Sequence, residues 1–286
     1  MTIRFLDFIR KYPVITYLIL AFAISWGLII ILAGPGNIPI DAENSKNLLP
    51  MLYIMMLIGP STAGILLIRL ENGKEGFRKF TKRLFRWRIG IHWYFVALLA
   101  TPALASLVLF ILSRISSEFS IGILGYKDKI SSIMIGIMTG ILVGLFEETG
   151  WSGYIVPKLR LRYSITTTGL IIGFIWGAWH FILFWESDSF SETLPLFILL
   201  TRLFTWLPPF RVFMVWILDR TGSLLLVILT HASLVFTTTV LVPMTLTGKN
   251  LLVWLIAWSL ALWIIGGTAT IFKSGIRLQK SNEMNQ

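Results

Sequence analysis

Eight long apolar stretches run through the chain, and they constrain its fold more than any other feature. They cover roughly residues 13–33, 48–68, 92–113, 131–157, 166–185, 196–218, 223–244 and 251–272. Each is close to the ~20 residues that a helix needs to cross a bilayer. Inside lipid, the backbone polar groups of a helix bond to one another, so such stretches are stable as spanning helices. We therefore predict an all-α, polytopic transmembrane helix bundle with about eight spans.

The composition supports a membrane protein and argues against other classes. Charged residues make up 14% of the 286 residues, whereas a soluble domain usually carries about 25%. The formal net charge is +11, but the basic residues lie in short segments between apolar stretches, as in membrane proteins. We therefore expect membrane lipids as partners and no nucleic acid. The chain has no cysteine, which excludes disulfides, thiolate metal ligands and a cysteine nucleophile.

Lys and Arg are distributed unevenly between the connecting segments. Eight of them lie between Arg69 and Arg88, and others follow at residues 158–162 and at Arg211 and Arg220. Cytoplasmic loops of membrane proteins carry such an excess of positive charge. We therefore predict that these segments are cytoplasmic loops and that both termini lie inside.

The sixth apolar stretch, residues 196–218, is the least regular of the eight. Arg202, the Pro208-Pro209 pair and Arg211 interrupt it. Proline ends or kinks a helix because it lacks the backbone N–H. The stretch therefore forms either a kinked span or an interfacial helix followed by a short one.

We expect a single membrane-embedded domain over residues 1–286. The polar groups that could perform chemistry lie in a core at about 131–244, and residues 273–286 form a polar tail. The protein is expected to be an integral, multi-pass membrane protein, in the plasma membrane if its source is prokaryotic.

Two adjacent carboxylates, Glu147 and Glu148, lie in an apolar run without other charges, and His180 and His231 lie in later apolar stretches. A charge deep in a bilayer costs at least ~2.5–3.5 kcal/mol, so intramembrane ionisable residues are candidate functional residues. At ~1.5 Å rise per residue, Glu147 and His231 lie roughly 16 Å, and His180 about 18 Å, from the inside ends of their helices. The sequence therefore predicts these groups at one level near the midplane.

Carboxylates and imidazoles in one dry pocket suit hydrolysis by either of two routes. Glu147 can act as a general base on water while a histidine donates to the oxyanion. Alternatively, Glu147, His180 and His231 can hold a zinc ion with water at the open position. Two other hypotheses stay open at this point. The polar groups can simply hold helices together, or the acids can carry protons in a proton-coupled transporter.

The motifs around these residues resemble those of the CPBP/Abi family of intramembrane proteases, which includes the CAAX prenyl endopeptidases. The family's EExxxR motif corresponds to residues 147–154, which read EETGWSGY. Its FxxxH or WxxxH motif corresponds to Trp176 and His180, and its HxxxN or HxxxD motif begins at His231. The resemblance covers about residues 144–236.

This resemblance implies an intramembrane endopeptidase that hydrolyses a peptide bond in a membrane-associated peptide or lipidated protein. Glu147 would activate the attacking water and Glu148 would support it. His180 would assist at the water or bind metal, and His231 would stabilise the oxyanion or bind metal. The alternative is a non-catalytic membrane binding protein such as a bacteriocin self-immunity factor.

Two positions depart from the family pattern. Ser152 replaces the motif arginine, which would face Glu148 one helical turn away, so we expect Glu148 to be protonated or paired with a group outside the motif. Val235 replaces the family asparagine and cannot donate a hydrogen bond to an oxyanion. Losing such a donor typically costs ~10²–10³ in rate. We therefore expect another donor, such as Ser233 or Thr238, or weak activity.

Overall fold

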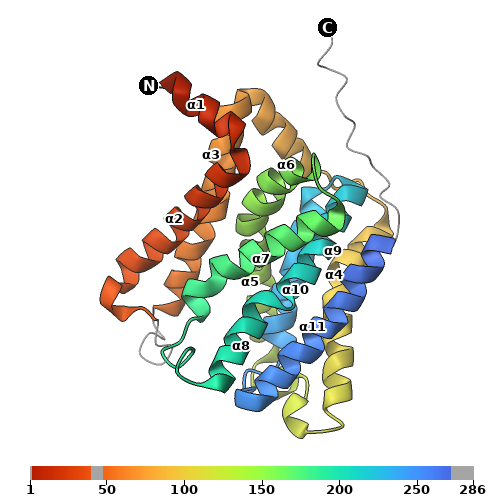
Figure 1. Ribbon diagram of the computed structural model, residues 1–286. Helices are drawn as coiled ribbons and strands as arrows, with labels where there is room; N and C mark the ends of the chain where they lie inside the picture. Colours follow the sequence, from red (N-terminus) through yellow and green to blue (C-terminus); the bar gives the residue numbers. More distant parts are fainter. Residues whose placement is uncertain (1, 40–47, 272–286) are drawn as a thin grey trace.

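The computed structural model describes residues 2–39 and 48–271, and every regular element in these ranges is helical (Figure 1). A short helix, α1 (Thr2–Lys11), precedes the apolar ones. The longer elements are α2 (Pro13–Ala33), α3 (Leu49–Leu84), α4 (Ile91–Leu112), α5 (Lys129–Gly150), α7 (Ile165–Phe184), α8 (Thr193–Phe204), α9 (Leu207–Thr221), α10 (Leu224–Phe236) and α11 (Gly248–Ile271). Eight helical segments of the described chain are long and apolar enough to cross a membrane. The predicted helix bundle is therefore confirmed.

Shorter elements join or extend these helices. Single 3₁₀ turns lie in the connections, at η1 (Pro35–Asn37), η2 (Ser117–Phe119) and η3 (Gly122–Gly125). Two π-helical turns continue long helices: η4 (Trp151–Ile155) links α5 to α6 (Val156–Arg160), and η5 (Thr237–Leu241) follows α10. Such π-helical turns occur frequently at functional sites, and η4 directly follows the paired glutamates.

Helix α3 extends well beyond the predicted span at residues 48–68. It continues to Leu84, with a break at Gly73, where φ is 56°. Glycine adopts this left-handed backbone conformation without a side-chain clash. The basic segment between Arg69 and Arg88 is therefore mostly helical, and the prediction that it is a loop was wrong for all but its last few residues.

The sixth apolar stretch forms two helices, α8 and α9, which are separated at Thr205 and Trp206. Together, Thr193–Thr221 are long and apolar enough for one span, so the structure favours the kinked-span alternative. The two prolines lie in the first turn of α9, where a missing N–H leaves no helical bond unmade. The indole nitrogen of Trp263 donates to the Thr205 carbonyl at 3.0 Å and so satisfies a backbone group at the break.

Helix α5 packs closely against α10, and this contact positions the candidate site. Gly136, Gly140 and Gly144 form one stripe of α5 along the contact. A Cβ atom at Gly140 would lie 2.5 Å from the Ala232 carbonyl oxygen, and one at Gly144 would lie 2.7 Å from that of Ile228. Small residues at this spacing allow membrane helices to approach closely. The last turn of α5 therefore lies directly beside α10.

The start of α1 and the end of α11 lie at the same end of the bundle (Figure 1). Helix α6 and the second part of α3, which carry many of the basic residues, lie at this end too. This arrangement fits an even number of spans. The placement of this end in the cytoplasm stays a prediction, as does the single-domain organisation over residues 1–286, and the predicted tail at 273–286 lies outside the described residues.

Candidate active site

The paired glutamates lie in the last turn of α5, and both are buried. Glu147 is 3% exposed and Glu148 is fully buried. Helix α5 continues directly into η4, and the Trp151 N–H donates to the carbonyls of both glutamates. Carboxylates in such surroundings need hydrogen-bonded or charged partners.

Glu148 has such partners on both of its carboxylate oxygens. Oε2 accepts hydrogen bonds from the Ser152 hydroxyl and from Nη1 of Arg211, the latter at 2.7 Å. Oε1 lies 2.7 Å from Nδ1 of His231. Of the two states expected for Glu148, the structure therefore shows pairing with a group outside the motif.

That group, Arg211, was not expected at this site. From sequence, Arg211 was predicted to be one of the cytoplasmic loop charges. This prediction was wrong, because Arg211 lies in the second turn of α9 and is 0% exposed. Its guanidinium carbon lies 4.1 Å from the centre of the Trp176 ring and 6.0 Å from that of Trp151. The sequence did hold a signal, since a charged residue inside an apolar stretch is a candidate functional residue by the argument already applied to the glutamates.

His231 extends from α10 and is 2% exposed. Because a carboxylate oxygen can only accept, the contact with Glu148 places a proton on Nδ1 of the imidazole. In the neutral ring, Nε2 then keeps its lone pair. The contact therefore selects one tautomer of His231 and fixes the orientation of its ring.

Glu147 is held by Trp176 of α7, whose indole nitrogen donates to Oε2 at 2.6 Å. The same indole makes T-shaped contacts with the rings of His231 and His180, with ring centres 5.3 Å and 5.1 Å away. Trp176 thus touches three of the four predicted catalytic residues. The sequence showed it only as the aromatic position of a motif.

His180 lies one turn after Trp176 on α7 and is only partly buried. Its Nδ1 donates to the Trp176 carbonyl at 2.8 Å, which again leaves Nε2 as the free nitrogen of the neutral ring. The ring packs against both Trp176 and Trp179. The structure therefore places His180 at the edge of the cluster, in contact with Trp176 and not with the glutamates' hydrogen-bond network.

The segment that carries these residues is similar in sequence to known proteins. Residues 129–237 match the family model described as type II CAAX prenyl endopeptidase Rce1-like, and this range runs from α5 to the end of α10. The resemblance to the CPBP/CAAX endopeptidase family is confirmed. A curated CAAX prenyl protease 2 from Methanococcus maripaludis is 29% identical over 139 residues, which cover 47% of this chain and 51% of that protein. The chain thus matches about half the length of this relative.

Within the CAAX endopeptidase-like segment, the expected replacement donors face elsewhere. The Ser233 hydroxyl donates to the Leu98 carbonyl at 2.8 Å and lies 2.9 Å from the Thr101 hydroxyl, so it joins α10 to α4. Thr238 is exposed and donates to the Val235 carbonyl. The structure does not bring either hydroxyl into the cluster around Glu148.

Carboxylates and imidazoles are side chains that bind metal ions, but their arrangement in this cluster fits a metal ion less well. One ligand atom each from Glu147, Glu148 and His231 lie within 4.8 Å of one another. Both histidines have Nδ1 fixed by an oxygen, as metal-bound histidines commonly do. However, His180, which belongs to the predicted zinc set, lies outside this group, and both oxygens of Glu148 already have partners. A bound zinc would supply Lewis-acid activation of water.

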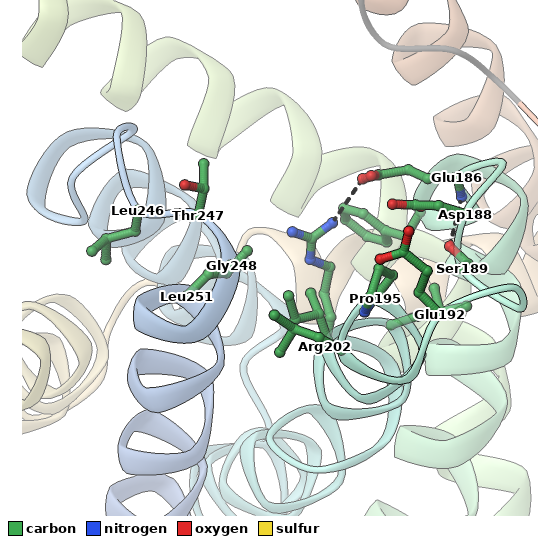
Figure 2. Close-up of a pocket in the computed structure, with 14 residues that line it drawn as sticks. Glu186, Asp188, Ser189, Glu192, Pro195, Arg202, Leu246, Thr247, Gly248 and Leu251 are labelled. Carbon is green, nitrogen blue, oxygen red and sulfur yellow. Dashed lines mark hydrogen bonds and ion pairs between the residues drawn. The ribbon is translucent and has the colours of Figure 1, made fainter.

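A second group of charged residues lies after the end of α7 and on α8, and Phe184, which lines its pocket, packs against the His180 ring with ring centres 5.9 Å apart. These residues line a pocket of about 360 Å³. Figure 2 shows Glu186, Asp188, Glu192 and Arg202 around it. Nη1 of Arg202 lies 3.7 Å from a carboxylate oxygen of Glu186, whose side chain is 57% exposed. This pocket contains none of the predicted catalytic residues. The buried cluster around Glu148 is therefore the candidate active site.

Proposed function

We propose that the protein is an intramembrane endopeptidase in which Glu147 activates the attacking water. The observation that carries this proposal is the unequal role of the two buried glutamates. Glu148 has both oxygens occupied by Ser152, Arg211 and His231, whereas Glu147 accepts one hydrogen bond, from Trp176. One carboxylate is thus fixed as a structural anion, and the other keeps an oxygen for proton transfer.

The arrangement supports a simple sequence of steps. The water oxygen attacks the carbonyl carbon of the peptide bond while Glu147 takes a proton from that water. A protonated His231 donates from both ring nitrogens, so Nε2 can stabilise the oxyanion while Nδ1 stays on Glu148. Glu147 then returns its proton to the leaving amine nitrogen as the C–N bond breaks. His180, with Nε2 free and its ring partly exposed, orients the water or the substrate.

The substrate that fits this site is a membrane-associated peptide or lipidated protein. The glutamates and His231 are buried among spanning helices, so a substrate must approach from the membrane or from its surface. The name of the curated relative, a CAAX prenyl protease, supports a peptide bond in a lipid-anchored protein as the target. A non-catalytic binding role or a transport role would leave such peptides intact.

The test is a comparison of C-terminal peptides in cells that express the wild-type protein or the Glu147→Gln variant. Glu186→Gln is the matched control, because it removes a carboxylate of the exposed pocket. We expect cleavage products with the wild type and with Glu186→Gln, and none with Glu147→Gln, at equal protein levels. Products that persist with Glu147→Gln would remove Glu147 as the base.

Zinc use is a separate part of this proposal, and it has its own measurement. The zinc content of the purified protein distinguishes metal-assisted from metal-free hydrolysis. If zinc takes part, the wild type should hold about one ion per chain and His231→Ala should lose it. If the glutamate acts without metal, cleavage should proceed in protein that contains no zinc.

A further inference from the structure

The position of Ser152 leaves a buried carboxylate without the charge that the family motif would supply. Ser152 follows Glu148 by one helical turn and donates to its Oε2. Ser152 is 2% exposed and Glu148 is 0% exposed, so bulk water does not screen the carboxylate. A hydroxyl gives one hydrogen bond and no positive charge. Another group must therefore neutralise Glu148.

Arg211 meets the same carboxylate oxygen from a different helix. Its Nη1 lies 2.7 Å from Oε2 of Glu148, the oxygen that Ser152 also contacts, although Arg211 is 63 residues further along the chain. The side chains of Arg211 and Glu148 are both 0% exposed. The Arg211 guanidinium thus makes the contact with Glu148 that an arginine at position 152 is expected to make.

The surroundings of Arg211 hold it in this one position. The faces of Trp176 and Trp151 lie within 6.0 Å of the guanidinium, a distance at which a cation is attracted to an aromatic ring. In the described part of the chain, its Nε and Nη2 have no hydrogen-bond partner and are buried. Arg211 therefore acts through the groups that it contacts, and its one ion pair in the described part of the chain is with Glu148.

We infer that Arg211 is the positioning residue of this active site and replaces the motif arginine that is absent at Ser152. Arg211 and Ser152 hold Oε2 of Glu148, which leaves Oε1 to fix Nδ1 of His231. The orientation of His231 towards the reacting carbonyl therefore depends on a charge that comes from α9. This inference rests on the proposed function, since it concerns the same hydrolytic site.

The decisive experiment measures kcat and KM separately on a peptide found by the C-terminal comparison. Outer-shell partners that orient metal-binding side chains are typically worth about 10–100-fold, and we expect Arg211→Met to lower kcat by a similar factor. KM should change by less than about twofold, because Arg211 does not touch the substrate. Arg202→Met, an arginine of the exposed pocket, is the matched control and should keep wild-type kcat.

A relocation variant separates a positioning role from a general packing role. In Ser152→Arg with Arg211→Ala, the guanidinium returns to position 152 while α9 makes room for it. We expect this double variant to recover most of the kcat that Arg211→Ala loses. Arg211→Lys should have a lower kcat than this double variant, because an ammonium lacks the planar donors of arginine. A folded relocation variant that stays as slow as Arg211→Ala would overturn the inference.

A thermal measurement in detergent keeps the inference testable if the relocation variant does not fold. The fall in melting temperature caused by Arg211→Met should be clearly smaller in a Glu148→Gln background than in the wild type. An equal fall in both backgrounds would show that Arg211 does not act through Glu148.

The two proposals fail in different ways. If the wild type and Glu147→Gln give the same peptides, the proposed function fails, while the thermal coupling between Arg211 and Glu148 is still measured. If the wild type cleaves and Arg211→Met keeps its kcat, the proposed function stands and the inference about Arg211 fails.

Discussion

Two arginine–glutamate pairs in this protein consist of the same residue types but differ in distance and in burial. Arg211 and Glu148 lie 2.7 Å apart with both side chains 0% exposed. Arg202 and Glu186 lie 3.7 Å apart with side chains 23% and 57% exposed (Figure 2). The first pair is surrounded by Ser152, His231 and tryptophan rings, and the second faces an open pocket.

The difference shows how burial decides what an ion pair does. Taking two charges out of water costs several kcal/mol per ion, and further hydrogen bonds must offset this cost. A buried pair that includes one motif residue, Glu148, and contacts another, His231, is therefore a candidate functional site. An exposed pair is screened by water and salt, and it contributes little.

The largest effect on the free energy of unfolding is expected when Arg211 and Arg202 are replaced in turn. Arg211→Met leaves Glu148 buried without its cation, which should lower the free energy of unfolding by about 3–5 kcal/mol. Arg202→Met should change it by about 0–1 kcal/mol. Denaturation of both variants in detergent micelles provides the measurement. Equal losses would mean that the buried pair has no special energetic role.

Removing the second donor to Glu148 should have a smaller effect. Ser152→Ala deletes a hydrogen bond to a carboxylate but leaves Arg211 in place, so we expect a loss of about 1.5–3 kcal/mol. The control is Ser113→Ala, which removes an exposed hydrogen bond to the Phe110 carbonyl and should stay within about 0.5 kcal/mol. If Ser152→Ala matches this control in the same unfolding assay, Arg211 alone holds Oε2.

The break between α8 and α9 provides an intermediate case. Trp263→Phe keeps most of the ring but removes the donor to the Thr205 carbonyl, and a neutral hydrogen bond is worth about 0.5–1.5 kcal/mol. We expect a loss of that size, measured by unfolding. A variant as stable as the wild type would indicate that water satisfies this carbonyl.

The exposed pair should give the smallest effect and the only salt-sensitive one. Glu186→Gln should change stability by less than about 1 kcal/mol, and the difference should shrink further as salt is added. The coupling between Glu148 and Arg211 should be insensitive to salt, because ions do not reach it. A buried coupling that falls with salt would show that the site is open to water.

Some of this site was visible in the sequence and some was not. The sequence placed Glu147, with Glu148 next to it, and His231 at one depth of the membrane, because Glu147 and His231 lie about the same number of residues from a basic helix end. It placed His180 there as well. Depth, however, does not fix the direction of a side chain. The structure shows His180 bonded to the Trp176 carbonyl, outside the group formed by the other three.

Arg211 is the opposite case, a residue that belongs to the site although the sequence did not predict it there. Its neighbours along the chain include two prolines and several aromatic residues, which made a loop or interface plausible from sequence. The close packing of α9 against α7 buries it instead. Nothing within one helical turn of Arg211 indicates that its partner is Glu148, so local sequence could not reveal the pair.

The sequence by itself determined the helical bundle and the identity of most ionisable groups within it. The reason is that lipid offers no hydrogen bonds, so each apolar stretch of about 20 residues must form a helix. Only the tertiary structure decided which of those groups meet. That choice depends on how closely the glycine stripe of α5 lets α10 approach and on which face α9 turns inward, and both are properties of packed helices rather than of any one segment.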